Sequence, residues 1–385
     1  MTRETTPSTR RCDLDWLRII AFILLIFYHT GMFYVTWDWH VKSAYAGHAL
    51  EPLMVLLNPW RLDLLFLISG VATRFMAERM SALKLAGSRF NRLFWPLLFG
   101  IFVIVPPQSF CQVMDKLHYA GGFAGFYLKY VTGYHGWCQG DCLIVPTWNH
   151  LWYLAYLLAY SLVFAALWPL FRRLPVQWLK TLPAWTWVVL PLAYLFAIRV
   201  FLLPVFGETH ILVGDWYLHA ESFAMFLVGV MVARFEPFFE FCARRYRGLL
   251  IAALVAWTVI AVAMTTNLFD SLSALQWRWF GGFVRETQTW CGILALIGFA
   301  RTHLSHADGP VRRTLTEAIF PFYIIHQTII VVAGFTLKQM HLPLAVEASG
   351  ILIVTFAGCW ITYLAVRAIP VLRPVFGLKL NAGKA

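Results

Sequence analysis

Charged residues are scarce in this sequence of 385 residues: only 13% are Asp, Glu, Lys or Arg, whereas 60% are hydrophobic. Soluble domains contain about 25% charged residues, so the composition excludes an ordinary water-soluble protein. The mean hydropathy of +0.67 instead indicates a polytopic membrane protein. The 18 Trp residues fit the aromatic belts that form where helices leave a bilayer.

Motifs of several soluble protein classes are missing. The seven cysteines include no C-x-x-C pair and no His/Cys cluster, which predicts that no metal is bound. We find no Walker loop, no Rossmann glycine pattern and no internal repeat. The formal net charge of +12 could suggest a nucleic-acid partner, but the basic residues lie in short loops between apolar runs. We therefore expect no nucleic-acid partner.

Apolar segments of nearly the length that a bilayer requires, roughly 20 residues, recur along the chain. They predict an all-α, polytopic membrane bundle of about ten transmembrane helices, with Pro106-Pro107 ending the third. The polar stretch before the first segment has no signal-peptide pattern. The segments are 16–36, 51–76, 93–110, 148–171, 184–205, 217–234, 248–266, 283–300, 317–338 and 350–369.

Lys and Arg residues lie mainly in alternate loops. The loops on one side contain only Lys42, Lys116, Lys129 and Arg278, whereas all six loops and tails on the other side are basic. The positive-inside rule therefore predicts cytoplasmic termini. The chain then divides into an N-terminal tail (1–15), a ten-helix domain (16–370) with an outer loop at about 108–147, and a C-terminal tail (371–385).

The predicted outer loop contains three of the cysteines, Cys111, Cys138 and Cys142. An oxidising compartment would allow one disulfide with one thiol left over. The alternative, that all three cysteines are reduced, stays open at this point.

The first apolar segment contains two ionisable residues, Arg18 and His29. A separation of eleven positions places them on one helix face, about 16 Å apart along the axis. Arg18 could simply reach the cytoplasmic interface, and His29 could be a hydrogen-bonded packing residue. Because ionisable groups inside a bilayer usually mark a site, the sharper hypothesis is that His29 acts as a general base.

Two further groups of polar residues lie in and after the second segment. Arg61 and Asp63 are expected to form a buried ion pair with each other or with neighbouring helices, and Ser69-Gly70 to allow close helix approach. Arg89 and Arg92 share one helix face, as i and i+3 positions do. Their guanidinium groups suit phosphates, although an ordinary basic loop would look the same.

Polar and aromatic residues also gather near the outer ends of the predicted spans. They favour either an aromatic belt with charged rim residues or a carbohydrate site in which rings stack on sugars. His326, in the inner half of the ninth span, could contact a donor or simply pack. The outer residues that we predict to bind an acceptor are Arg61, His150, Trp152, Glu221 and Glu286.

Taken in order, several motifs resemble the acyltransferase-3 family of integral membrane O-acyltransferases. Within this family, Leu14-Asp15-Trp-Leu-Arg18 and Trp39-His-Val-Lys-Ser43 are similar to the branch of glucan-biosynthesis protein C, which is associated with glucan succinylation. The motifs are Arg18-x10-His29, Leu65-Phe-Leu-Ile-Ser-Gly70, Arg89-x-x-Arg92, His150-Leu-Trp-Tyr and Pro321-Phe-Tyr-Ile-Ile-His326.

The resemblance implies transfer of an acetyl or succinyl group from cytoplasmic acyl-CoA to an extracytoplasmic carbohydrate, by a protein of the bacterial inner membrane. It implies that His29 is catalytic with Arg18 as its partner, and that Arg89 and Arg92 lie near the donor. Asp63 or Glu221 could orient His29. Direct transfer and a covalent acyl-histidine both stay open, and the protein could form a homo-oligomer in the lipid.

A rival from another class is a secondary transporter or flippase for an acidic sugar or lipid. It would explain the intramembrane charges equally well. It predicts repeats or broken helices in matching halves of the chain, which the sequence does not display.

Overall fold

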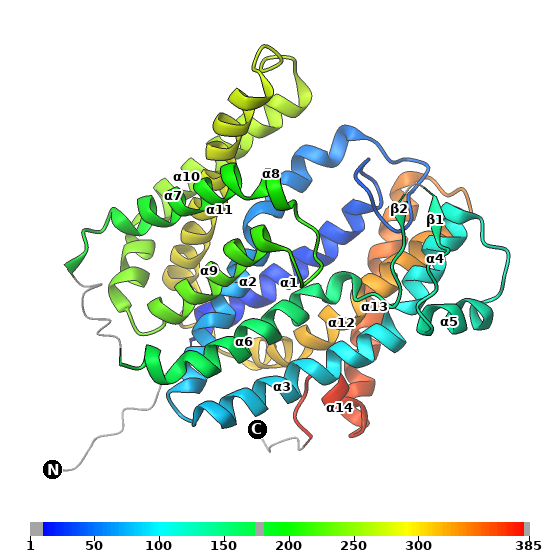
Figure 1. Ribbon diagram of the computed structural model, residues 1–385, viewed down its shortest axis with the longest axis horizontal. Helices are drawn as coiled ribbons and strands as arrows, with labels where there is room; N and C mark the ends of the chain where they lie inside the picture. Colours follow the sequence, from blue (N-terminus) through cyan, green and yellow to red (C-terminus); the bar gives the residue numbers. More distant parts are fainter. Residues whose placement is uncertain (1–10, 140, 174–180, 381–385) are drawn as a thin grey trace.

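The computed structural model describes residues 11–139, 141–173 and 181–380, and most of these residues are helical (Figure 1). The all-α fold class is therefore confirmed, and every predicted apolar segment falls in a helix. The elements are α1 (Cys12–Met32), η1 (His48–Leu50), α2 (Glu51–Ala77), α3 (Ala82–Phe99), η2 (Gly100–Ile104), α4 (Pro106–Leu117), α5 (Phe123–Val131), β1 (Cys138–Gln139), β2 (Asp141–Cys142), η3 (Asn149–Leu151), α6 (Trp152–Phe171), α7 (Thr186–Phe201), α8 (Leu203–Phe206), α9 (Trp216–Val232), α10 (Glu236–Thr265), α11 (Ala274–His303), α12 (Pro310–Lys338), α13 (Leu344–Ala368) and α14 (Leu372–Val375).

Seven helical runs in the described chain are long and apolar enough to cross a membrane: His48–Ala77, Ala82–Leu117, Asn149–Phe171, Thr186–Phe206, Glu236–Thr265, Pro310–Lys338 and Leu344–Ala368. Of the other three predicted spans, α9 is apolar but shorter, and α1 and α11 carry several charged side chains. The count of ten spans and the cytoplasmic termini therefore stay predictions. The two predicted tails lie partly outside the described residues. The basic residues Arg3, Arg10, Lys180 and Lys384, which support that topology, lie wholly outside them.

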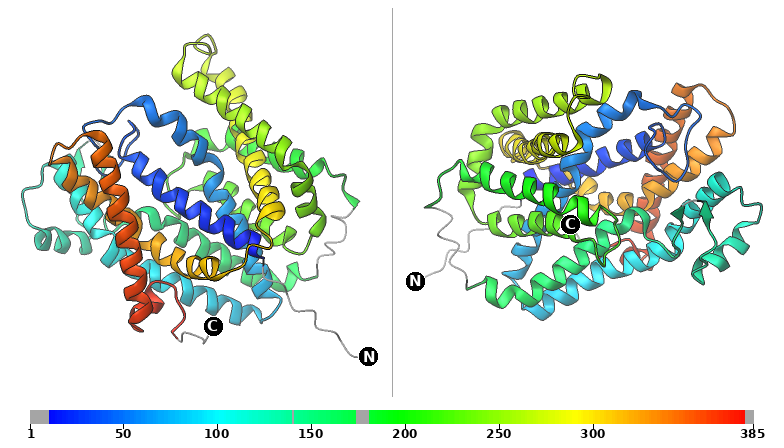
Figure 2. Two further views of the ribbon diagram at one scale, coloured as in Figure 1. Left: turned by 180° about the vertical axis from the view of Figure 1, so that it is seen from behind. Right: turned by 45° about the horizontal axis from the view of Figure 1, so that its top comes forward.

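Helix α1 runs through the middle of the bundle. It packs against α2, α11 and α12 and touches α13. Figure 2 (left) shows α1, in dark blue, between α13 and the α10–α11 pair. This central place brings the side chains of α1 against helices from both halves of the chain.

Helices α2 and α9 approach each other through glycines. A Cβ atom added at Gly70 would lie 2.0 Å from the carbonyl oxygen of Phe226, and one at Gly229 would lie 1.9 Å from that of Leu67. Only residues without a side chain allow backbones this close. The close helix approach predicted for Ser69-Gly70 is confirmed.

A proline inside α2 interrupts its backbone hydrogen bonding. Pro59 has no N–H group, so the carbonyl of Val55 loses its helical partner. The buried side-chain amide of Gln288 in α11 donates to that carbonyl at 2.8 Å. This hydrogen bond satisfies a group that lipid could not satisfy and ties α2 to α11 just before Arg61.

The prediction that Pro106-Pro107 ends the third span was wrong, because both prolines begin α4, where a missing N–H is tolerated. The π-helical turn η2 joins α3 to α4 and leaves backbone carbonyls without helical partners. The hydroxyls of Tyr127 and Tyr130 donate to two of them at 3.0 and 2.9 Å. Much of the predicted outer loop is thus helical and anchored to the bundle.

The outer segment that follows contains a disulfide. Cys138 and Cys142, paired across β1 and β2, are bonded at 2.04 Å. Cys111 is a buried free thiol. The structure thus has one disulfide and one free thiol among these three cysteines, which is the first of the two alternatives.

Candidate active site

Two histidines from opposite ends of the chain meet beside the centre of the bundle. Nδ1 of His29, in the last turn of α1, lies 2.9 Å from Nε2 of His326 in α12. The two ring planes are within 4° of each other and the ring centroids are 5.0 Å apart, as expected for an edge-to-edge hydrogen bond. The structure therefore gives His29 a histidine as its partner, where the sequence suggested Asp63 or Glu221.

The backbone fixes the protonation pattern of this histidine pair. Nδ1 of His326 lies 2.8 Å from the carbonyl oxygen of Tyr323, to which it can only donate. When both rings are neutral, Nε2 of His326 must then accept the proton of His29 Nδ1. The remaining nitrogen, Nε2 of His29, is consequently unprotonated and able to accept a proton.

His29 borders a cavity of about 470 Å³ that is lined by aromatic, amide and charged side chains. We call it the outer cavity, because the predicted topology places it towards the extracytoplasmic side. The lining comes from α1, α2, η3, the start of α6, α12 and three loops, around residues 38–40, 147–148 and 208–211. Aromatic faces next to hydrogen-bonding groups are the surroundings that a sugar requires. The side chains that supply them are Tyr28, Trp39, Trp148, Trp152, Asn58, Asn149 and Gln327.

Arg61 is buried at this outer cavity, with 2% of its surface exposed. Its guanidinium lies over the Tyr28 ring, 3.9 Å from the centroid. Its Nε and Nη1 atoms have no hydrogen-bond partner among the described residues. The predicted pair with Asp63 is not formed, because positions i and i+2 of a helix face different directions.

An amide and imidazole network supports one wall of the outer cavity, and sequence reasoning missed it. Oε1 of Gln108 accepts from Gln327 and from Asn149, both at 3.1 Å. Gln327 also contacts Nε2 of His40 at 3.0 Å, and Nδ1 of His40 lies 2.6 Å from Oε1 of Gln112. The network joins α4, α12 and the loop after α1, which are far apart in sequence.

His150, predicted to bind an acceptor, also has its ring at the outer cavity. Its Nε2 donates to the carbonyl of Ile324 at 2.9 Å, and its Nδ1 lies 3.5 Å from the Gln108 amide. Since both nitrogens have protein partners, His150 joins η3 to α12. His29 keeps an available nitrogen in the same cavity.

A second, inner pocket of about 110 Å³ lies towards the other end of α1. Arg18, Arg89 and Arg92 line it together, with Phe22, Tyr153 and Phe320 among its other walls. Arg89 is buried and donates to the Thr73 hydroxyl. The structure thus brings Arg18 of α1 together with Arg89 and Arg92 of α3, near one candidate donor site.

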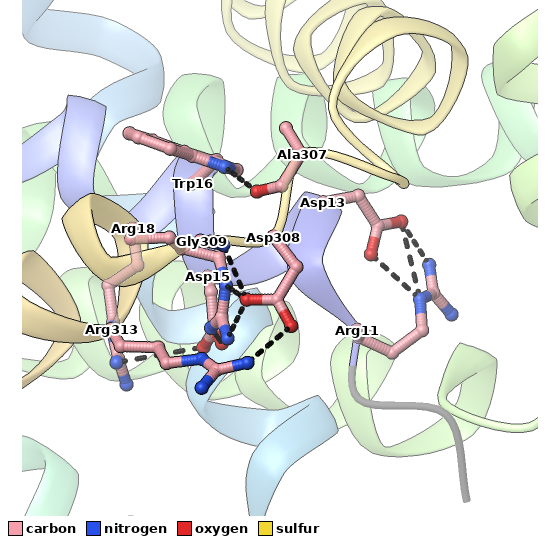
Figure 3. Close-up of polar contacts among 10 residues, drawn as sticks. Arg11, Asp13, Asp15, Trp16, Arg18, Ala307, Asp308, Gly309 and Arg313 are labelled. Atoms are coloured by element: carbon pink, nitrogen blue, oxygen red, sulfur yellow. Dashed lines mark hydrogen bonds and ion pairs between the residues drawn. The ribbon is translucent and has the colours of Figure 1, made fainter.

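Arg18 belongs to a network of ions at this end of α1 (Figure 3). Asp15 lies 3.8 Å from Arg18 and 2.5 Å from the buried Arg312, which also pairs with Asp308 at 2.8 Å. The hydrogen bonds from Arg312 and Arg313 hold the pKa of Asp308 down, at about 2. These contacts attach the start of α1 to the loop between α11 and α12.

Tyr323 separates the inner pocket from the outer cavity. Its ring lies 5.2 Å from that of Phe22 and 6.0 Å from that of Tyr153, both of which line the inner pocket. Its hydroxyl donates to the carbonyl of His150 at the outer cavity, at 2.6 Å. A buried aromatic side chain therefore fills the space between the two sites.

The other predicted site carboxylates lie elsewhere. Glu286 pairs with Arg199, and Glu221 lies 3.9 Å from the same arginine. Asp63 is close enough to interact electrostatically with these residues. None of these three carboxylates lines the cavity that His29 borders.

Comparison with known proteins gives one match to a protein family. A family model described as an acyltransferase domain, of the acyltransferase-3 type, matches residues 13–364. "Glucans biosynthesis protein C" from Salmonella paratyphi B, Salmonella heidelberg and Salmonella dublin is 28% identical over 105 residues. The match spans 27% of this chain and 27% of the length of each relative. No solved structure matches the chain.

Proposed function

The chain belongs to the acyltransferase-3 family of membrane acyltransferases, and we propose that it moves an acyl group from cytoplasmic acyl-CoA to a hydroxyl of a periplasmic or cell-surface carbohydrate. The acyl group is acetyl or succinyl, the acceptor is a carbohydrate such as a glucan, and the site is the bacterial inner membrane. One observation carries the proposal: the unprotonated Nε2 of His29 borders a sugar-sized outer cavity, while three arginines line a pocket at the other end of α1.

The inner pocket suits the donor. Arg18, Arg89 and Arg92 offer guanidinium forks to phosphates. A pocket of about 110 Å³ cannot hold a whole CoA molecule. We therefore place the CoA phosphates at its mouth, with the thin pantetheine arm continuing past Tyr323 towards His29.

His29 would act as a general base in this transfer. Its Nε2 takes the proton of a sugar hydroxyl as that oxygen bonds to the thioester carbon. The carbon–sulfur bond breaks, and the CoA thiolate takes the proton back from the imidazolium. His326, which accepts from His29 Nδ1, stabilises the tautomer in which Nε2 is free.

Arg61 favours succinyl as the acyl group. It is a buried cation at the cavity that His29 borders, and two of its nitrogen atoms have no partner among the described residues. A buried charge without a counter-ion is costly, so an anionic substrate group would offset that cost. The free carboxylate of a succinyl group has the charge and the geometry for this contact.

The experiment is transfer of labelled acyl groups by the purified protein. Radiolabelled succinyl-CoA and a glucan acceptor should yield stable label on the glucan, and His29→Ala should abolish it. Arg61→Gln should reduce kcat/KM for succinyl-CoA more than for acetyl-CoA. Equal loss with both donors would remove the role of Arg61, and wild-type transfer by His29→Ala would refute the proposed function.

A further inference from the structure

A third pocket, of about 350 Å³, lies outside both sites described above. It is formed by the beginnings of α2 and α11, the end of α10, and α7 with α8. Three arginines line it, Arg199, Arg278 and Arg285, and the proposed reaction uses none of them. We call it the Arg285 pocket.

The three arginines differ in how their charges are compensated. Arg199 pairs with Glu286, and Arg278 donates at 2.7 Å to the carbonyl of Val200 in the last turn of α7. Within the described part of the chain, no carboxylate forms an ion pair with Arg285. The Nε atom of Arg285 is buried and has no hydrogen-bond partner there.

Two of these cations lie on one face of α11. Arg278 and Arg285 are seven positions apart on α11, so they lie on one helix face about 10 Å apart. Gly281 and Gly282 lie between them and line the same pocket. A Cβ atom at Gly281 would lie 2.9 Å from the Trp277 indole, and one at Gly282 would lie 3.7 Å from Arg199, so these two side chains pack over the helix between the guanidinium groups.

The surroundings of the Arg285 pocket are apolar and uncovered. Val55, Leu203, Pro204, Ile260 and Trp277 complete its lining, and nearby Phe201 and Val205 are 58% and 70% exposed. Its lining includes residues near the end of α10 and the beginning of α11, and these two helices meet in the hairpin whose tip is at the top of Figure 1. Trp277 and Trp279 begin α11, as residues at the outer membrane interface often do.

We propose that the Arg285 pocket binds the phosphate of an anionic lipid in the outer leaflet. Arg285 supplies a charge that forms no ion pair within the described chain, and Arg278, two helix turns away on the same face, contacts the same phosphate. The acyl chains cover Phe201 and Val205. An anion here offsets a charge that is costly in the low-dielectric interior. This inference rests on the predicted membrane orientation and is independent of acyl transfer.

The test is lipid binding to the full chain, purified and delipidated in a neutral detergent. The titrants are dioctanoyl phosphatidylglycerol, dioctanoylglycerol and inorganic phosphate, and the measurement is the thermal unfolding midpoint. Phosphatidylglycerol should raise the midpoint, and the other two should not. Arg285→Gln should weaken its Kd by about 10- to 100-fold, Arg285→Lys should weaken it less, and the exposed cytoplasmic control Arg245→Gln should leave it unchanged.

Three results would overturn the inference. Phosphatidylglycerol binding to Arg285→Gln with the wild-type Kd would exclude the site, and an equal midpoint shift with inorganic phosphate or dioctanoylglycerol would exclude a lipid phosphate as its ligand. Photo-crosslinking of the wild-type protein with a phosphatidylglycerol analogue covers the case in which the variant does not fold. It should label residues 199–206 and 274–285, and labelling confined to other segments would contradict the proposal.

Discussion

Replacement of His326 by phenylalanine probes the histidine pair most sharply. His326 accepts the proton of His29 Nδ1 at 2.9 Å, and its own Nδ1 donates to the Tyr323 carbonyl. Phenylalanine keeps a ring of similar size at this buried position but has no acceptor. The proton of His29 then has no partner on Nδ1, and the ring shifts towards the tautomer protonated on Nε2, which cannot act as a base.

The size of the effect follows from the lost hydrogen bond. A buried donor without a partner costs about 1–3 kcal/mol. If this cost must be overcome to restore the reactive tautomer, kcat falls about 5- to 150-fold. KM for acyl-CoA should change less than about twofold, because the Arg18, Arg89 and Arg92 pocket is intact.

The assay is release of CoA thiol by purified protein with a glucan acceptor, under single-turnover and steady-state conditions. His326→Gln is the matched control, since its amide oxygen can still accept from His29 Nδ1, and it should retain more activity than His326→Phe. A wild-type kcat for His326→Phe would refute the tautomer argument. Equal loss in both variants would show that packing, and not hydrogen bonding, is what His326 provides.

Three further predictions concern the sites on either side of the histidine pair. The double variant Arg89→Gln, Arg92→Gln should raise KM for acyl-CoA at least about tenfold with little change in kcat, because charge-assisted hydrogen bonds to phosphate are lost. Unchanged initial-rate kinetics would exclude these residues from the donor site. Tyr323→Ala should connect the inner pocket with the outer cavity and so increase the hydrolysis of acyl-CoA in the absence of acceptor, measured as release of the CoA thiol. An unaltered rate of hydrolysis would mean that Tyr323 does not close this passage. Burial lowers the pKa of His40 to about 4, so His40 binds a proton more readily when the loop at 33–47 is unfolded. The folded loop should therefore lose stability as pH falls from about 6.5 to 4. Hydrogen exchange should record this loss in the wild type and not in His40→Gln.

Local features of the sequence predicted the helices and part of the site. Long apolar segments identify helices because a bilayer requires them, and the eleven-residue spacing of Arg18 and His29 fixes their separation along one helix. The structure adds that Arg18 lies in the inner pocket and His29 at the outer cavity. The residue spacing within a single helix was enough to predict how far apart Arg18 and His29 lie.

Contacts between distant segments could not be predicted in the same way. His29 and His326 are 297 positions apart, and only the packing of α1 against α12 brings them together. A single sequence gives no signal for such a pair, or for the amide of Gln288 that satisfies a carbonyl freed by Pro59. Glu286 resembles a binding residue in sequence, but its ion pair with Arg199 is visible only in the folded bundle.

Transfer across a sealed membrane tests the central claim most directly. Proteoliposomes are loaded with radiolabelled succinyl-CoA, glucan is added outside, and the orientation of the protein is checked by protease accessibility. We predict label on the external glucan with the wild-type protein and none with His29→Ala. Label on glucan only when donor and acceptor share one side would contradict the account, as would transport of a solute without any acyl transfer.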